Sequence, residues 1–467
     1  MSREGEKVSA LSPTELKAEE AAPRKAVPEA QQGLHRFVIV GGGAGGLELA
    51  TRLGETLGKR NRAHITLVDK SRTHLWKPLL HAVAAGSMDP SEEELNYLAQ
   101  AHWRHFDYRI GEMVGLDRAA KVVHLAATYD EDGQEITPVR SVPYDTLIMA
   151  VGSVTNDFGT KGVAEYAIPL ETAQQAVRFN RRLVNACIRA QSQGVPIKPG
   201  QLHVAIIGAG ATGTELAAEL HRTAREIIAH GLDRIDPDRD IKITLLEAAP
   251  RILPALPDKV SSAALQLLKN IGVDVKTSAR VSEVTAEGVR LASGEFIPAA
   301  LVVWAAGVKG PDFLKDLGGL ETNGANQLVV TQTLQTTRDP NIFAIGDCAA
   351  CPRPGFPEPV PPRAQAAHQE AAHLVRQMRR LLEGKPLQPF KYKDFGSLVS
   401  FGEYSTVGNL MGFLVGRNLF IEGYFARLMY RSLHLMHEVA LYGGWRASLR
   451  ALARKLSKPS EPTVKLH

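Results

Sequence analysis

Two glycine-rich loops of the same pattern constrain this chain more than any other feature of its sequence. Each follows a short apolar run, at 36–40 and 202–207, and precedes a segment with helical periodicity. Both have the spacing G-x-G-x-x-G, and their glycines are Gly41, Gly43, Gly46, Gly208, Gly210 and Gly213. In such strand–loop–helix units the glycines allow a tight turn, the close approach of a pyrophosphate, and packing of the helix on the strand. We therefore predict two dinucleotide-binding units, each of which holds a pyrophosphate on the amide groups at a helix N-terminus.

An acidic residue ends the second predicted strand of each unit. Asp69 lies 23 residues after Gly46, and Glu247 lies 34 residues after Gly213. The usual spacing of a ribose-binding carboxylate is about 20 residues, and the polar insert 230–240 accounts for the longer second spacing. Because such a carboxylate accepts hydrogen bonds from the ribose 2′-OH and repels a 2′-phosphate, Glu247 favours NADH over NADPH.

Two dinucleotides in one chain indicate FAD and NADH, whose reactive rings would meet between the domains so that a hydride passes from nicotinamide to flavin. The alternative is a duplicated nucleotide-binding domain that lacks a flavin. The segment Ile-Phe-Ala-Ile-Gly-Asp-Cys-Ala at 342–349 argues against that alternative, because together with the loops it resembles the two-dinucleotide-domain disulfide reductase superfamily of flavoproteins. The resemblance implies that Asp347 binds the ribityl chain of FAD. The segments 146–152 and 302–307 are similar to further motifs of the superfamily.

The cysteines narrow the choice within this superfamily. Disulfide reductases carry a reactive pair soon after the first glycine loop, but the span 41–110 contains no cysteine, which excludes a dithiol mechanism there. Only Cys187 is distant from the close pair Cys348 and Cys351, so the separated cysteines of a sulfide:quinone oxidoreductase fit weakly. The close pair has no further ligands at zinc spacing. We therefore predict structural thiols and no metal site.

Several further segments are similar to those of the type II NADH dehydrogenases, which pass electrons from NADH to a quinone without pumping protons. These segments are 74–86, 151–159, 361–369, 396–400 and 465–467. With them, the resemblance extends over nearly all of the chain from residue 36 onward.

The A-Q-x-A-x-Q pattern within 361–369 is similar to the quinone-site pattern of that family. Its glutamines, Gln365 and Gln369, lie four residues apart and share one helix face, where their amides can donate hydrogen bonds to quinone carbonyls. The alternative is a pair of solvated glutamines at the start of a surface helix. Phe395 stands before Gly396 where many relatives have a basic residue, so a cationic role at that position is not carried over.

Glu215 lies two residues after Gly213, in the first turn of the second predicted helix. The helix dipole alone favours an acid there, but the resemblance implies that this glutamate reaches the nicotinamide and flavin, to orient NADH or to relay protons to the reduced quinone. The expected catalytic residues are therefore Glu215, Gln365 and Gln369. Further cofactor-binding residues are expected at Ala44, Gly45, Lys70, Met113, Ala150, Gly152, Thr212, Ala306, Gly307, Ala364 and Gln365.

The sequence beyond residue 405 predicts two amphipathic helices with a basic face. Apolar residues follow a helical period within 421–440 and again within 445–456, after the break at Gly443 and Gly444. From Phe413 onward there are nine Lys/Arg and three Asp/Glu, a local net charge of +6 compared with +5 for the whole chain. Basic amphipathic helices lie in the membrane interface, where anionic lipid adds roughly 1 kcal/mol per basic residue. The alternative is a helical pair that forms a dimer lid, and nucleic acid fits less well because no basic run is interleaved with aromatics.

The predicted fold class is α/β, with two Rossmann-like dinucleotide-binding domains of the glutathione-reductase type and C-terminal amphipathic membrane-anchoring helices. The chain has 467 residues, 44% of them hydrophobic, enough for two or three domains. We expect a disordered leader at 1–35, a split FAD-binding domain at 36–160 and 320–385, an NADH-binding domain at 161–319, and a membrane-anchoring region at 386–467.

The expected function is oxidation of NADH by non-covalent FAD and transfer of the electrons to a membrane quinone. No run of 18 apolar residues and no apolar N-terminal signal is present, so neither a transmembrane helix nor a secretory signal is expected. With the basic tail, the family resemblance implies a peripheral homodimer on anionic lipid at the cytoplasmic face of the inner membrane, and no nucleic-acid partner is expected. Two alternatives stay open. One is a soluble NADH-dependent reductase of a protein electron carrier, and the other is a non-catalytic flavin-binding interaction module.

Overall fold

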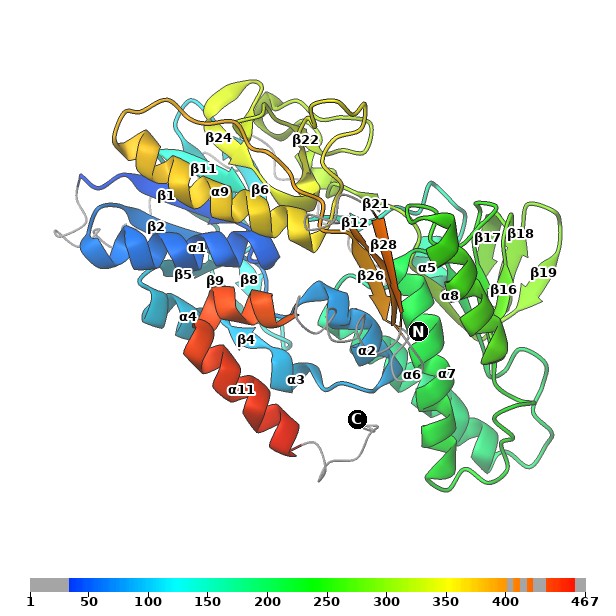
Figure 1. Cartoon of the computed structure of the whole chain (residues 1–467). Helices are drawn as coiled ribbons and strands as arrows, with labels where there is room; N and C mark the ends of the chain where they lie inside the picture. The colour runs from blue at the N-terminus through cyan, green and yellow to red at the C-terminus, as the bar shows by residue number, and fades with distance from the viewer. Residues whose placement is uncertain (1–32, 401–405, 412–417, 423–433, 458–467) are drawn as a thin grey trace.

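The computed structural model of the chain describes residues 33–400, 406–411, 418–422 and 434–457. Two α/β units lie side by side, with the C-terminal elements against both (Figure 1). The predicted leader lies outside the described residues except for 33–35, and the terminal motif at 465–467 lies outside them entirely.

The first unit is built on a six-stranded sheet in the order β23-β24-β11-β1-β2-β5. Its strands are β1 (Arg36–Val40), β2 (His64–Asp69), β5 (Asp107–Ile110), β11 (Thr146–Met149), β23 (Gln335–Thr336) and β24 (Asp339–Ala344). Neighbouring strands are parallel except β23 and β24. The central strands β1 and β11 are almost entirely buried apolar runs, as expected for parallel strands covered on both faces. The helices α1 (Ala44–Thr56) and α9 (Ala364–Leu382) pack side by side over this sheet (Figure 1).

The second unit is built on a five-stranded parallel sheet in the order β13-β20-β14-β15-β16. Its strands are β13 (Ala167–Pro169), β14 (His203–Ile207), β15 (Lys242–Leu246), β16 (Asp274–Lys276) and β20 (Leu301–Trp304). Its principal helices are α6 (Ala173–Ser192), α7 (Ala211–Ala229) and α8 (Asp258–Asn270).

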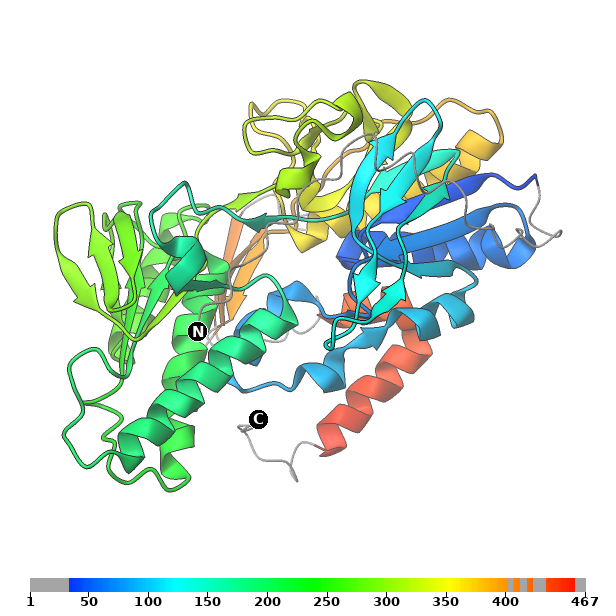
Figure 2. The ribbon, with the colours of Figure 1, turned by 180° about the vertical axis from the view of Figure 1, so that it is seen from behind.

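Each unit also carries a small antiparallel sheet. The first has β6 (Met113–Asp117), β7 (Val122–Leu125) and β10 (Arg140–Pro143), and the second has β17 (Val281–Thr285), β18 (Gly288–Leu291) and β19 (Phe296–Pro298). Figure 2 shows the second of these sheets at the outer end of its unit, remote from the first unit.

Two features join the units. Short strands β12 (Val154–Thr155) and β21 (Val308–Lys309) pair antiparallel where the chain passes between them. The helix α2 (Leu80–Ala85) follows the first glycine loop in sequence, but its side chains pack in the hydrophobic core of the second unit, against α6 and α7. The sequence analysis did not predict this crossing, which places part of the segment 74–86 beside the second loop.

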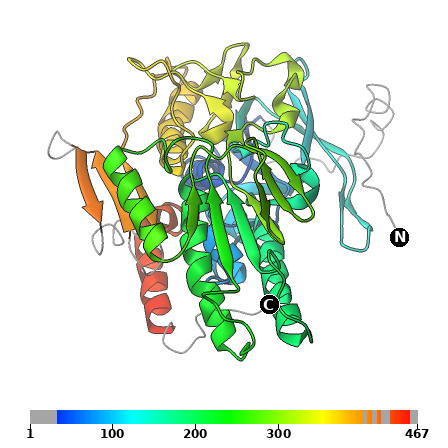
Figure 3. The same ribbon diagram turned by 90° about the vertical axis from the view of Figure 1, so that its right-hand side faces the viewer.

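The C-terminal region contains a sheet as well as helices. The strands β26 (Ser397–Ser400), β27 (Thr406–Met411) and β28 (Asn418–Glu422) form an antiparallel sheet, and Figure 3 shows its first strands beside α8. Helical residues 434–442 and α11 (Gly444–Ser457) follow. None of the helices that the structure describes is both long and apolar enough to cross a membrane.

The predicted helical period over 421–440 is therefore wrong at its start. Ile421 lies in β28, where it pairs with Gly408 of β27. The run Asn-Leu-Phe-Ile-Glu is short, aromatic and β-branched, and periodicity cannot separate a strand from a helix over so few residues. The rest of the predicted first helix up to residue 433 lies outside the described residues.

Candidate active site

The predicted cofactor residues lie at the carboxyl edges of the two parallel sheets. In the first unit Gly41 and Ala150 directly follow β1 and β11, Asp69 is the last residue of β2, and Asp347 comes shortly after β24. In the second unit the second glycine loop, Glu247 and Ala306 follow β14, β15 and β20 in the same way. Ligands of open α/β sheets bind at this edge.

The helices α1 and α7 begin without a capping side chain from any described residue. Their N-cap residues are Gly43 and Gly210, and neither helix has an acid in its first turn. By contrast, Thr172 and Gln175 form a capping box at the start of α6. Because the first N–H groups of a helix need a partner, the two uncapped ends are suited to bind an anionic pyrophosphate.

The glycines of each loop serve different purposes. Gly41 has φ +103°, and a Cβ atom there would lie 2.3 Å from the Ala150 carbonyl oxygen. A Cβ atom at Gly46 would lie 1.9 Å from the Gly41 carbonyl oxygen, so both positions exclude a side chain. A Cβ atom at Gly43 or Gly210 would meet no described atom within 4 Å. The middle glycine therefore leaves open space for the close approach of a ligand, as predicted for a dinucleotide loop.

The two ribose-binding candidates make equivalent contacts. The Gly42 amide donates to Asp69 Oδ2 at 2.6 Å, and the Ala209 amide donates to Glu247 Oε2 at 2.8 Å. Burial raises the pKa of Asp69, and the bonds from Gly42 and Ser71 oppose the shift. A carboxylate accepts about four hydrogen bonds, so both acids retain capacity for ribose hydroxyls.

Asp347 lies in a 3₁₀ turn directly after β24. Its Oδ2 accepts a hydrogen bond from Ser153 Oγ at 2.8 Å, and its backbone oxygen accepts one from Gln327 Nε2 at 2.8 Å. Met113 is buried in β6, whereas Lys70 is exposed and pairs with Glu112 at 3.2 Å.

The second loop also closely approaches the turn after β20. A Cβ atom at Gly208 would lie 2.6 Å from Ala306 Cα, and Gly307 has φ +65°. Gly152, in the corresponding turn of the first unit, has φ +70°. Thr212 is exposed in the first turn of α7.

Glu215 is the fifth residue of α7, so the prediction that it lies in the first turn of the helix is wrong. Its side chain is 5% exposed and faces α2. Its Oε2 is 3.4 Å from Nδ1 of His81, which is 8% exposed. Burial lowers the pKa of His81, and the charge of Glu219 opposes the shift. The sequence analysis quoted His81 within the segment 74–86 but did not select it, because its partner becomes apparent only when α2 crosses to the second unit.

Glu370 is a second buried acid that the sequence analysis missed. Its Oε2 accepts a hydrogen bond from the Gly346 amide at 2.6 Å, beside Asp347. Burial raises the pKa of Glu370 to about 8, and the charge of Asp347 adds to the shift, while the Gly346 bond opposes it. The sequence signal that could have identified Glu370 is an acidic residue between Ala367 and Ala371, which are both buried on the same helix.

Gln365 and Gln369 are partly buried on α9, and their amides bind backbone. Gln365 Nε2 donates to the Gly396 carbonyl at 2.9 Å, and Gln365 Oε1 accepts from the Phe395 amide at 3.2 Å. Gln369 makes a matching pair of bonds to the backbone of Lys393, at 2.8 and 3.0 Å. Both side chains thus hold the segment 393–396 against the start of α9, where Ala364 is the first residue.

The three cysteines are free and buried. Burial raises the pKa of Cys187 to about 11 and the pKa values of Cys348 and Cys351 to about 12. The thiols therefore stay protonated near neutral pH, in agreement with the predicted structural role.

Comparison with known proteins gives a consistent assignment. Residues 35–371 match the family model described as pyridine nucleotide-disulphide oxidoreductase. The chain is 42% identical over 446 residues to a type II NADH:quinone oxidoreductase of Haemophilus influenzae, which covers 93% of this chain and 100% of that protein. It is 31% identical over 439 residues to the type II NADH:quinone oxidoreductase NdhA of Mycobacterium tuberculosis, covering 91% and 87%. The fold is similar to NDH2 from Plasmodium falciparum in complex with NADH, with a TM-score of 0.76, 18% identity, and 92% and 100% coverage.

Proposed function

The chain belongs to the pyridine nucleotide-disulphide oxidoreductase family and, within it, to the type II NADH:quinone oxidoreductases, and we propose that the glycine loops at the uncapped starts of α1 and α7 hold FAD and NADH. The enzyme oxidises NADH and passes the electrons to a quinone. The observation that carries the assignment of the loops is their placement at the carboxyl edges of the two parallel sheets. The chain also matches a relative of that activity over 93% of its own length and 100% of the relative.

The residues around the first loop fit FAD. The uncapped start of α1 and the open space at Gly43 suit its pyrophosphate, Asp69 suits its adenosine ribose, and Asp347 suits the ribityl hydroxyls. Bound there without a covalent link, FAD would supply the hydride acceptor for NADH and the electron donor for the quinone. The corresponding groups of the second loop, with Glu247, hold NADH.

We assign Glu215 to the nicotinamide side of the site. His81 Nδ1 lies 3.4 Å from Glu215 Oε2, so the imidazole helps to hold the carboxylate between the two units. A carboxylate held in this way orients the nicotinamide and holds a proton that can pass toward the reduced quinone. His81 acts through Glu215 and is therefore a positioning residue.

Gln365 and Gln369 serve the quinone side. Their amides fix the backbone of 393–396, which would form one wall of a passage whose other wall is the start of α9. Gln365 Nε2 also donates to Asp394 Oδ1 at 3.4 Å, which uses its second hydrogen, so Gln365 shapes the passage. The second hydrogen of the Gln369 NH₂ group can donate to a quinone carbonyl.

The membrane-facing surface would combine two elements. On α11, Trp445, Leu449 and Leu452 are 77%, 46% and 55% exposed, and on α4 (Tyr97–Arg104) Leu98 and Trp103 are each 65% exposed. The Gln100 amide on α4 donates to the Leu441 carbonyl at 3.0 Å, which joins α4 to the helical residues before α11. Large apolar side chains exposed together mark a docking surface. We infer that it rests on anionic lipid at the cytoplasmic face of the inner membrane, in a homodimer.

Anaerobic titration tests the function in two stages. Addition of NADH to the purified yellow protein should bleach the flavin absorbance, and a quinone added afterwards should restore it at about one FAD per chain. A flavin that NADH does not bleach contradicts the assignment of NADH to the second loop. A bleached flavin that a protein carrier reoxidises while quinone does not would favour the soluble reductase instead.

A further inference from the structure

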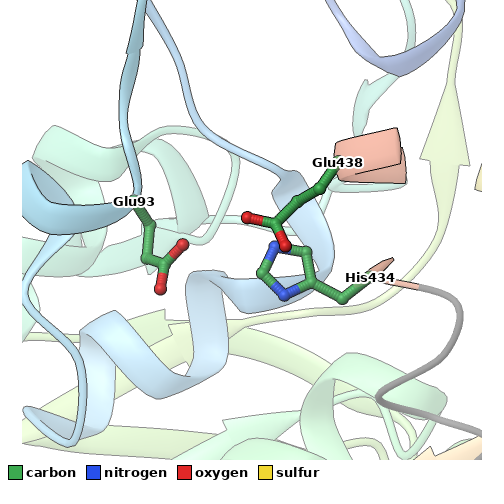
Figure 4. Close-up of side chains that lie close together, drawn as sticks. All are labelled: Glu93, His434 and Glu438. Carbon is green, nitrogen blue, oxygen red and sulfur yellow. The ribbon is translucent and has the colours of Figure 1, made fainter. Parts of the chain in front are cut away.

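Three side chains of metal-binding types converge at a place that the electron-transfer assignment does not use. Glu93 is the last residue of the short helix α3 (Pro90–Glu93), and His434 and Glu438 lie one turn apart on the helical residues 434–442. One ligand atom of each lies within 4.8 Å of the other two. Figure 4 shows the three side chains pointing toward one another from these two separate parts of the chain.

The surroundings hold these groups in place. Trp76 stacks on the His434 imidazole, with ring centroids 5.1 Å apart and an interplanar angle of 9°. Glu438 is 4% exposed, and Arg450 Nε approaches its Oε1 at 3.9 Å. A small cavity of ≈ 20 Å³ opens among these residues, which is room for about one water-sized group.

The separations are compatible with an ion. Zn²⁺ binds imidazole nitrogen and carboxylate oxygen at about 2.0–2.2 Å, which puts ligand atoms of a tetrahedral site roughly 3.4 Å apart. Three ligand atoms already within 4.8 Å of one another reach that spacing through small side-chain movements.

We propose that Glu93, His434 and Glu438 bind a divalent first-row transition-metal ion of the Zn²⁺ type, which fastens the helical residues before α11 to α3. The imidazole favours such an ion over Mg²⁺ or Ca²⁺, which take oxygen ligands. Three protein ligands leave a fourth position for water. The ion would link residues distant in sequence, so its binding stabilises the folded chain and fixes the base of α11. The proposal is independent of the electron acceptor.

The test uses the full-length flavoprotein after removal of metals with a chelator. Titration with Zn²⁺ against a chromophoric competitor should give one tight site per chain. Each of E93Q, H434Q and E438Q should weaken this site by about tenfold or more, since even the loss of a group behind a ligand costs 10–100-fold. The matched control is E92Q, which changes an exposed acid of the same short helix and should leave the affinity unchanged.

Two further measurements do not depend on catalysis. Zn²⁺ should raise the melting temperature of the wild type but not of E93Q. It should also change the fluorescence emission of Trp76. W76F should remove this change in emission and still bind one Zn²⁺ per chain. R450Q should bind Zn²⁺ more tightly, because the competing cation beside Glu438 is lost. Affinity should fall at low pH because a bound imidazole must be deprotonated.

Three results would overturn the proposal. The first is a wild type that binds no Zn²⁺ beyond the level of H434Q. The second is that E92Q weakens binding as much as E93Q does. The third is that neither R450Q nor E93Q changes the affinity for Zn²⁺. In each case the three side chains form an internal hydrogen-bonded cluster only. If E438Q reduces FAD content by unfolding, E93Q decides the question, because Glu93 is partly exposed and lies outside the hydrophobic cores.

Discussion

Glu370 combines nearly complete burial with a position beside Asp347, in the turn that we propose binds FAD. Burial raises its pKa to about 8, while an unfolded glutamate titrates near 4.5. Between these values the folded protein binds a proton that the unfolded chain releases, so the free energy of unfolding falls as pH rises through this window. We predict that E370Q removes this fall, and that the variant gains on the order of a few kcal/mol relative to the wild type from pH 5 to pH 9.

Urea unfolding in excess FAD, repeated across this pH range, measures the Glu370 difference. The control is E383Q at the end of the same helix, where the exposed Glu383 has a pKa lowered by Lys385. E383Q should not flatten the pH dependence. Parallel curves for wild type and E370Q would show that Glu370 is ionised throughout the range.

We predict that Glu247 decides the choice of nicotinamide cofactor at the second loop. E247Q keeps an acceptor for the Ala209 amide but removes the charge that repels a 2′-phosphate and weakens the bond to the 2′-OH. We predict that kcat/KM for NADH falls about tenfold, corresponding to a hydrogen bond of 1–1.5 kcal/mol, while kcat/KM for NADPH rises. Steady-state kinetics with both cofactors measure the ratio, and FAD content is the control. An unchanged ratio would mean that another group reads the ribose.

At the scale of elements, the start of α9 and the segment 393–396 form one unit because Gln365 and Gln369 bind its backbone. Q365A should therefore slow reoxidation of the flavin by quinone, by about tenfold for the loss of an amide hydrogen bond, and spare its reduction by NADH. Stopped-flow measurement of each half-reaction decides this.

The control for Q365A lies on the same helix. Gln377 accepts a hydrogen bond from the Gln388 amide at 2.8 Å, three turns further along, so Q377A removes the same kind of bond away from the proposed passage. It should lower stability without slowing either half-reaction selectively. A defect of Q365A confined to the NADH half-reaction would refute the quinone role.

The elements divide into those that local sequence predicts and those that it does not. The glycine loops and the acids after the second strands could be predicted because turn, helix start and acid all follow one another in the chain. His81 and Glu370 could not be predicted, because the role of each depends on a partner on another element. The partner of His81 is Glu215, and the partner of Glu370 is the Gly346 amide. The strand at 418–422 was missed for a related reason: its conformation depends on pairing with β27 rather than on its own periodicity.

At the scale of the whole molecule, the C-terminal helices pack against the first unit as well as forming part of the proposed lipid-facing surface. His437 Nε2 lies 3.0 Å from His74 Nε2, and His74 Nδ1 lies 2.9 Å from the carbonyl of Gly42 in the first loop. Because that carbonyl only accepts, His74 donates from Nδ1, and His437 must donate to His74 Nε2. Leu441 also lies in the hydrophobic core of the first unit. Truncation after about residue 418 would therefore be expected to disturb FAD binding, which makes such a truncation a poor test of the membrane anchor.

Substitution of exposed side chains tests the anchor without this damage. We predict that the triple variant W445Q/L449Q/L452Q leaves the membrane fraction, because burial of each such side chain in lipid contributes about 1.5–3 kcal/mol. The loss in affinity for anionic vesicles should exceed about 100-fold. Bleaching by NADH should be unchanged, since the three side chains are 77%, 46% and 55% exposed on α11 and lie outside the hydrophobic cores.

Co-sedimentation with vesicles measures the loss, and a variant of equal apolar content is the control. Y129Q/F296Q/V308Q changes side chains that are 60%, 37% and 50% exposed on other elements, and it should sediment as the wild type does. Wild-type attachment should weaken with salt, because part of it comes from basic residues such as Arg446 against anionic lipid, and this attraction is screened. If the α11 variant stays on vesicles as tightly as the wild type but becomes monomeric, α11 covers a dimer interface instead of lipid.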